Sequence, residues 1–268
     1  MNPDAALYLE ECDQVLEALG TPVQERYDLL KSHHATAEKR YYPLAQEVIT
    51  GTYVGDYDYV LDLLDRCYFP TREGVANFHD NFVDALILAG EEKIAEGKVE
   101  QAVTLYKKAF TYPENHQVFL VDERATHDAQ INYCLGEAYA ALGQDAEAEK
   151  YWKLAAEQDY ELKGSKDFRY WTGLALERLG RKAEAEAIFS ALVADGEAAV
   201  VTQHVNFYGA EGTTGVTVDI INSAAYYTQA LGHLGLGHRG KAKRLFAEVQ
   251  RLKPDHLWAN EFMKQFEK

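Results

Sequence analysis

The chain has 268 residues, of which 47% are hydrophobic and 26% charged, a composition typical of a folded protein. Its formal net charge of −16 at pH 7 repels phosphate backbones and anionic lipids, so we expect neither nucleic acid nor a membrane surface as a partner. Three widely spaced cysteines, Cys12, Cys67 and Cys134, do not form a disulfide framework and favour a reducing compartment. The start of the chain has no signal-peptide pattern and no apolar stretch is long enough to span a bilayer, so the sequence predicts a cytoplasmic protein.

Residues 4–66 contain two weak copies of one sequence pattern. The pattern is a glycine followed, after fixed intervals, by two residues that pack on the same face of a helix. The copies are Gly20–Glu25–Leu29 and Gly55–Val60–Leu64. Each copy predicts a pair of helices joined at its glycine.

Residues 82–256 contain four clear copies, in which the residues after the glycine are an alanine and an aromatic residue: Gly97–Ala102–Tyr106, Gly143–Ala148–Trp152, Gly180–Ala185–Phe189 and Gly237–Ala242–Phe246. A small residue also precedes each turn glycine, at Gly90, Gly136, Gly173 and Ala230. Small residues let two helices approach closely, and the large residue fills the groove between them. The copies therefore predict stacked helical hairpins, each burying its apolar face against its neighbours.

These repeats resemble tetratricopeptide repeats, whose period is about 34 residues. The segment Asn132–Gly143 is similar to the repeat consensus, and Pro254 follows Ala242 where the consensus ends its second helix. The resemblance implies an all-α, right-handed α-α superhelix of about six hairpins, forming one solenoid over residues 1–268. We expect residues 257–268 to form a C-terminal capping helix over the last hairpin.

Several longer phrases go beyond the general consensus: Phe69–Gly74, Tyr112–Asn115, Tyr170–Leu176 and Tyr226–Gly237. Together they resemble the C-terminal repeat region of large bacterial multidomain proteins that carry an uncharacterised, carbohydrate-related domain upstream. The resemblance covers nearly the whole chain but departs from the family around Val201–Thr217. It implies a bacterial helper region, and it supplies no catalytic residue for this chain.

Four insertions are expected between successive hairpins, at Arg66–Phe78, Thr111–Thr126, Asp159–Lys166 and Ala194–Asn222. The longest insertion alternates apolar and polar residues around three glycines, which favours a β-hairpin or an ordered flap. Such loops contact a partner in some proteins and merely pack along an edge in others. The 200–220 segment is also a candidate surface for self-association into a homodimer.

In repeats of this kind the first helix of each hairpin lines the concave face. Counting from the small residues, the sequence predicts a tyrosine-rich, acidic groove at Tyr42, Tyr53, Asp84, Glu91, Gln130, Tyr133, Glu137, Asp167, Tyr170, Glu177, Arg178 and Tyr227. Tyrosines give binding faces a large, stiff contact area with a polar tip.

Metal-binding and catalytic patterns are absent from the sequence. His79–Asp80 and His127–Asp128 precede predicted helices, where an aspartate is more simply a cap or a dipole partner. The glycine-rich Gly232–Gly237 segment lies inside a hairpin and follows no strand, so it does not predict a nucleotide loop. We therefore expect no metal, no cofactor and no enzymatic activity.

The expected function is a scaffold that binds a protein or peptide, basic or aromatic in character, in the concave groove. The alternative is a carbohydrate-related accessory module, or a closed α/α toroid that processes glycosides through paired carboxylates. A toroid usually needs more helices than this chain provides.

Overall fold

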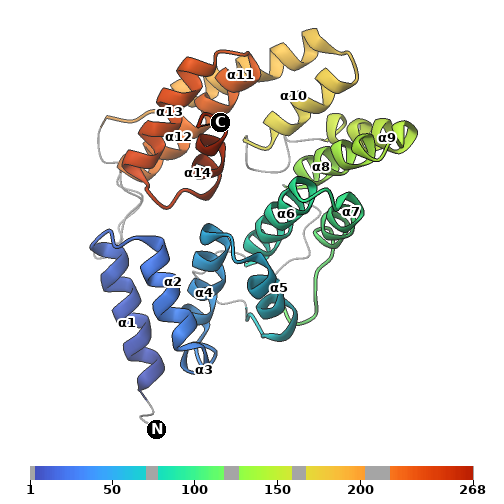
Figure 1. Ribbon diagram of the computed structural model, residues 1–268. Helices are drawn as coiled ribbons and strands as arrows, with labels where there is room; N and C mark the ends of the chain where they lie inside the picture. The colour runs from blue at the N-terminus through green and yellow to red at the C-terminus, as the bar shows by residue number, and fades with distance from the viewer. Residues whose placement is uncertain (1–3, 71–77, 118–126, 159–166, 203–217, 268) are drawn as a thin grey trace. The chain divides into compact units, whose positions relative to one another are not determined.

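In a computed structural model, residues 4–70, 78–117, 127–158, 167–202 and 218–267 are described, and every regular element among them is a helix (Figure 1). The chain divides into two compact units. Unit 1 comprises Met1–Glu123 and Glu137–Asp145, and unit 2 comprises Arg124–Gly136 and Ala146–Lys268.

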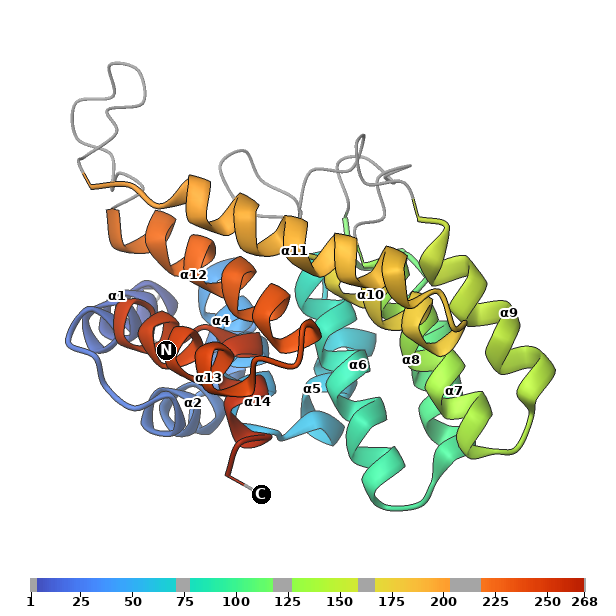
Figure 2. The same cartoon turned by 90° about the horizontal axis from the view of Figure 1, so that it is seen from above.

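The helices follow one another as antiparallel pairs (Figures 1 and 2). Six hairpins result, formed by α1/α2, α4/α5, α6/α7, α8/α9, α10/α11 and α12/α13, while α3 is a single turn and α14 follows the last hairpin. The all-α class, with about six hairpins and a terminal helix, is therefore confirmed. The bounds are α1 Ala5–Ala18, α2 Val23–Ser32, α3 His34–Ala37, α4 Tyr41–Val54, α5 Tyr57–Arg66, α6 His79–Ala95, α7 Val99–Lys108, α8 Asp128–Ala141, α9 Asp145–Ala156, α10 Arg169–Arg178, α11 Lys182–Ala199, α12 Val218–Gly235, α13 Arg239–Leu252 and α14 Leu257–Lys264.

The turn inside every hairpin is built in the same way. After α6, the Gly97 amide donates to the Ile94 carbonyl (3.0 Å) and the Lys98 amide donates to the Lys93 carbonyl (2.8 Å). These two hydrogen bonds close the end of the helix, and they require the glycine to adopt the left-handed backbone conformation. The six predicted turn glycines all have that conformation: Gly20, Gly55, Gly97, Gly143, Gly180 and Gly237.

In hairpins three to five, the predicted small residue lies directly against the predicted ring. A Cβ atom added to Gly90 would lie 2.2 Å from the Tyr106 ring, and one added to Gly173 would lie 2.3 Å from the Phe189 ring. Gly136 has the same relation to Trp152. Because the ring occupies the space of a side chain, the two helices of a hairpin interlock.

The first two hairpins are held together differently. In hairpin one, Arg26 of α2 forms a two-pronged ion pair with Asp13 of α1, at 2.8 and 2.9 Å, and both side chains are almost fully buried. In hairpin two, Gly51 of α4 approaches Val60 of α5, where an added Cβ would meet a methyl group at 2.7 Å. The same added Cβ would lie 3.0 Å from the ring of Tyr27, which comes from α2 of hairpin one and not from the partner helix α5. The short helix α3 was not predicted.

The insertion after α7 packs along an edge of unit 1 in its described part. The Asn115 side-chain amide donates to the carbonyls of Leu64 (2.9 Å) and Cys67 (2.6 Å). The neighbouring His116 ring binds the Leu64 carbonyl at 2.8 Å, and its backbone pairs with Phe69. The start of this insertion therefore closes the end of α5.

The insertion predicted at 194–222 is shorter than expected. Helix α11 continues to Ala199 and α12 begins at Val218, so both helices extend into the predicted loop. The base is tied by two hydrogen bonds between Asn222 and the backbone of Val201, at 2.9 and 3.0 Å. The expected β-hairpin and the dimer surface at 200–220 fall mostly on residues 203–217, which lie outside the described residues.

The core of unit 2 gathers α10 to α14 around buried side chains such as Phe189, Leu192, Phe246 and Val249 (Figure 2). Close packing of α11 on α12 depends on Gly232, where an added Cβ would lie 2.6 Å from the Phe189 carbonyl. This position confirms that the glycine-rich segment belongs to a hairpin. Among the helices described, none combines the length and apolarity needed to cross a bilayer.

Candidate functional site

Tyr170, a predicted groove residue, lies in the core of unit 2. Its side chain is 5% exposed, and its ring lies 5.8 Å from both Phe189 and Phe262, between ring centroids. Burial raises the pKa of the Tyr170 hydroxyl far above its ordinary value. The ring is thus already covered by neighbouring aromatic side chains in this conformation.

The covering side chain comes from α14. Phe262 is 4% exposed and contacts rings of three helices: Tyr170 of α10, Tyr227 of α12 and Phe246 of α13. The predicted capping helix therefore reaches beyond the last hairpin to the first helix of hairpin five. The helix covers Tyr170 and Tyr227, two tyrosines that the sequence predicts to line the groove.

Beside α14, three large aromatic side chains form a half-buried row, which we call the aromatic row: Tyr133 of α8, Trp171 of α10 and Trp258 of α14. Trp171 lies in the middle, with its ring centroid 5.6 Å from that of Tyr133 and 6.2 Å from that of Trp258. Aromatic rings at such distances attract each other, and each still presents part of its surface. The row therefore joins one predicted groove residue to two residues that were not predicted.

Tyr227 is half-buried and is held from the other side by His256, at 4.4 Å between ring centroids. His256 caps α14, because its Nδ1 accepts a hydrogen bond from the Ala259 amide at 3.2 Å. Burial, with a smaller contribution from Lys253, lowers the pKa of His256 to about 4, while Asp255 acts weakly in the opposite direction. A neutral His256 is what this cap requires.

The polar residues predicted in unit 2 have diverse surroundings. Gln130 is buried, whereas Glu177 and Arg178 are exposed. The Arg178 guanidinium lies 5.9 Å from the Trp152 ring centroid, a cation–π contact. Asp167 accepts a hydrogen bond from the Thr228 hydroxyl, and burial raises the pKa of its carboxyl group.

The remaining predicted residues lie in unit 1. The Tyr42 hydroxyl donates to Glu17 at 3.3 Å, and burial together with that carboxylate raises its pKa. Tyr53, Asp84 and Glu137 are half-buried, and Glu91 is exposed.

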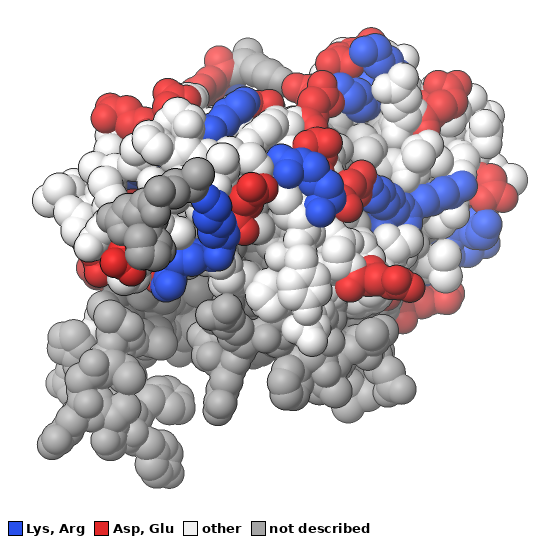
Figure 3. Space-filling view, turned by 90° about the horizontal axis from the view of Figure 1, so that it is seen from below, with Lys and Arg blue, Asp and Glu red and all other residues white. Residues whose placement is uncertain are grey.

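Tyr42 lines a cleft of about 880 Å³ in unit 1. Cations and anions share its walls, and Arg40 pairs with Glu10 at 2.7 Å. The same mixture appears on the molecular face in Figure 3, where lysines and arginines lie among acidic side chains. The described lining residues are Glu10, Glu38, Lys39, Arg40, Tyr41, Tyr42, Leu44, Arg66, Cys67, Tyr68 and Pro70.

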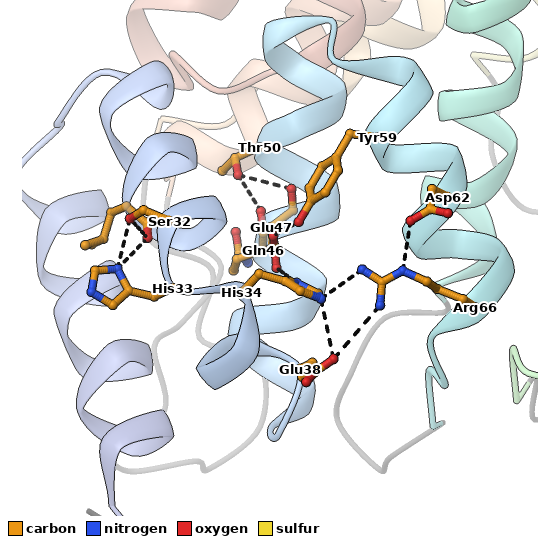
Figure 4. Close-up of polar contacts among 11 residues, drawn as sticks. Ser32, His33, His34, Glu38, Gln46, Glu47, Thr50, Tyr59, Asp62 and Arg66 are labelled. Atoms are coloured by element: carbon orange, nitrogen blue, oxygen red, sulfur yellow. Dashed lines mark hydrogen bonds and ion pairs between the residues drawn. The ribbon is translucent and has the colours of Figure 1, made fainter. Parts of the chain in front are cut away.

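Next to this cleft, a polar network surrounds the fully buried Glu47 of α4 (Figure 4). The carboxylate accepts hydrogen bonds from the Tyr59 hydroxyl (2.6 Å) and from His34 Nδ1 (2.9 Å). Arg66 donates to the other nitrogen of His34 at 2.9 Å and also binds Asp62. The network ties α3, α4 and α5 together, in addition to the close approach of Gly51 to Val60 in the same hairpin.

The sequence predicts that Asp80 and Asp128 act near helix starts and are not metal ligands. Asp80 and Asp128 lie in the first turns of α6 and α8, as predicted. Within the described ranges, no cluster of three or more histidine, cysteine or acidic side chains is arranged to hold a metal ion. The adjoining histidines are buried against rings instead: His79 stacks on Tyr112 at 4.1 Å, and His127 lies 4.4 Å from Phe168.

Sequence reasoning missed Trp171, Trp258 and Phe262 as part of the site. A signal was present, since Trp258 and Phe262 are four residues apart and therefore share one face of α14. That spacing shows that the helix is amphipathic, but it does not indicate which helices the apolar face covers.

No family model matches the chain. Two solved structures match the chain. One is described as YrrB, "a TPR protein with an unusual peptide-binding site"; it is 16% identical over 88% of this chain and 97% of that chain, with a TM-score of 0.32. The other is described as a putative kinesin light chain of Podosopora anserina with "nearly identical TPR-like repeats"; it is 16% identical over 94% of this chain and 97% of that chain, with a TM-score of 0.30.

At such identities and scores the likeness carries no argument about function. The tetratricopeptide-like character of the chain rests instead on its own residues. The same glycine turn recurs in every hairpin, and a small residue faces a ring in hairpins three to five.

Proposed function

We propose that the protein is a non-enzymatic scaffold that holds a peptide segment of a partner protein against unit 2. The aromatic row supports this proposal most directly. Tyr133, Trp171 and Trp258 come from three different helices, yet they form one half-buried strip. Tryptophan and tyrosine dominate the binding energy of protein interfaces because they bury much apolar surface at little entropic cost.

The preferred partner is a peptide with basic or aromatic side chains. Aromatic side chains would extend the stacking along the row. The exposed carboxylate of Glu177 lies on α10, the same helix as Trp171, and the net charge of −16 would draw basic segments toward the protein. The same charge disfavours nucleic acids.

The cellular setting is part of the proposal. A bacterial, cytoplasmic scaffold working beside a carbohydrate-related domain would agree with the phrases at Tyr112–Asn115 and Tyr226–Gly237. The alternative of a sugar-binding module or a glycoside-processing toroid stays a prediction that the described residues do not test.

The test uses peptides selected from a random library on the immobilised full chain. Replacing Tyr133 with alanine should weaken the selected peptides by about tenfold or more, because a hot-spot ring is lost. The matched control is Tyr8→Ala, which removes an exposed tyrosine of α1. Circular dichroism should show unchanged helicity in both variants. Peptides that bind the Tyr133→Ala variant as well as the parent, or a selection that yields no peptide, would refute the proposal.

A further inference from the structure

Helix α14 lies where a partner would be expected to lie. Its Phe262 contacts Tyr170 and Tyr227, which belong to the first helices of hairpins five and six. Its Trp258 contacts Trp171, the middle member of the aromatic row. A segment of the chain itself therefore covers two predicted partner-facing tyrosines.

The contact surface of α14 is a simple repeated pattern. Trp258 and Phe262 are four residues apart and therefore share one face of α14. Phe266 follows at the same spacing, in the turn after the helix ends at Lys264. Phe266 completes the series, with its ring 6.3 Å from that of Phe246 and 5.0 Å from the Arg239 guanidinium. The fully buried Ala259, next to Trp258, lets the helix backbone lie close to the surface.

The polar links between α14 and the rest of unit 2 are few among the described residues. Gln250 of α13 donates to Asn260 at 2.8 Å, and Arg239 donates to the Gln265 carbonyl at 3.4 Å. The cap from His256 is internal to the segment. A helix of eight residues does not hold its shape alone in water, so α14 is ordered mainly by its aromatic contacts.

We propose that the surface beneath α14 is a helix-docking site, and that an amphipathic helix of a partner, with aromatic residues four positions apart, docks there in place of α14. This inference rests on the proposed function and specifies its partner. The incoming helix carries a small residue beside its first aromatic residue, as Ala259 stands beside Trp258, and a polar outer face. Displacement withdraws Trp258 from the aromatic row, and it uncovers Trp171 beside Tyr170, whose ring centroids are 5.3 Å apart.

The experiment supplies α14 as a separate molecule. The probe is a fluorescent peptide with the sequence of residues 254–267, titrated against the full chain and against its Phe262→Ala variant. The parent chain, whose site is filled by its own helix, should bind the probe poorly. The variant should bind it about tenfold or more tightly, because its own helix has lost its central anchor.

Two matched controls separate docking from unspecific binding. A probe that itself carries Phe262→Ala should not bind the variant chain. The chain variant Lys264→Ala alters an exposed residue of α14, whose ion pair with Glu261 stays within the helix, and should behave like the parent. Equal probe binding by parent, Phe262→Ala and Lys264→Ala chains would overturn the inference.

Hydrogen exchange of the parent chain gives a second measurement that does not depend on a variant's folding. If α14 is displaceable, its amides exchange through a local opening, faster than the core amides of α12 and α13. Exchange of all three helices in a single event would show that α14 is an integral part of the core, and would contradict the inference. A concentration-dependent dimer that the Phe262→Ala substitution abolishes would contradict it too, by assigning the site to a second copy of this chain.

The two proposals fail in different ways. If selected peptides depend on Tyr133 but Phe262→Ala gains no probe binding, the scaffold function stands and displacement of α14 is wrong. If the probe binds the Phe262→Ala variant but selected peptides ignore Tyr133, the docking site stands and the aromatic row is not the peptide site.

Discussion

The first two hairpins and the next three solve the same packing problem by different chemistry. Hairpins three to five place a ring against a glycine, as Tyr106 does against Gly90. Hairpins one and two add buried polar groups, namely the Asp13–Arg26 pair and the carboxylate of Glu47, and hairpin two also packs Gly51 against Val60. A ring in a matching gap needs only shape, whereas a buried charge needs its partner at the correct position. The first region should therefore be more sensitive to loss of a single polar group, and the second to added volume.

The largest effect is expected from Asp13→Ala, which leaves the Arg26 guanidinium buried beside weaker contacts. Removing one member of a buried ion pair costs about 3–5 kcal/mol in the free energy of unfolding. Urea unfolding of unit 1 measures the loss. The double variant Asp13→Leu/Arg26→Met should return to within about 1 kcal/mol of the parent, because no charge then remains unpaired. A double variant as unstable as Asp13→Ala would show that the unpaired charge does not cause the loss of stability.

The second effect concerns volume in the ring-filled region. Gly173→Val places two methyl groups where the Phe189 ring lies 2.3 Å from an added Cβ, and should cost about 3 kcal/mol. Gly240→Val is the matched control, because an added Cβ there meets nothing within 4 Å and the position is also helical. Both variants are compared by urea unfolding of unit 2. A similar loss in the two variants would mean that helix propensity, and not the ring, explains the effect.

A smaller effect is expected from Tyr59→Phe, which removes one of the hydrogen bonds to the buried Glu47 carboxylate. A bond to a charged group is worth about 2 kcal/mol. In Tyr68→Phe the lost hydroxyl is exposed and bonds Gln117 at 3.2 Å, so its unfolding free energy should hardly change. If both variants lose the same stability, the Glu47 network contributes no more than a surface contact.

The last effect is a pH dependence in unit 2, which is small over any single pH unit. The pKa of His256 is about 4 in the folded protein and about 6.5 when unfolded. Between these values the unfolded state binds the extra proton, so stability falls as the pH falls, by about 1 kcal/mol per pH unit. His256→Asn keeps a side chain able to cap α14 but does not titrate. Its unfolding free energy should therefore vary less steeply between pH 6.5 and 4 than that of the parent, and parallel curves would contradict the assignment.

The difference between the two regions also explains what the sequence could predict. The turn glycines and the ring contacts of hairpins three to five lie at fixed intervals, so one pattern reveals each hairpin, as Gly173 and Phe189 show. The pairing of Asp13 with Arg26 occurs once and follows no period. A lone charge in a helix gives no indication that its partner lies buried on the next helix.

The candidate site was predicted less well than the fold, for a related reason. Counting within a repeat finds residues that face one side of a hairpin, and among them it selected Tyr133, which lies in the aromatic row. It treats every hairpin as open, and therefore could not foresee that Phe262, in a segment outside the repeats, covers Tyr170 and Tyr227. The extension of α11 to Ala199 was missed because the alternating apolar residues that follow suggested a loop.

The match between ring and small residue has a consequence for how such a chain can change its length. In hairpins three and four, the small residue and its ring belong to the same hairpin, as with Gly136 and Trp152, whereas the Phe189 ring of hairpin five also lies against Gly235 of hairpin six. Duplicating or deleting hairpin three or four would therefore leave every other ring with its own gap already filled. Gene-level insertions and losses of one such unit should therefore be tolerated more readily here than in the first two hairpins, where α3 and α5 both supply partners to a carboxylate of α4.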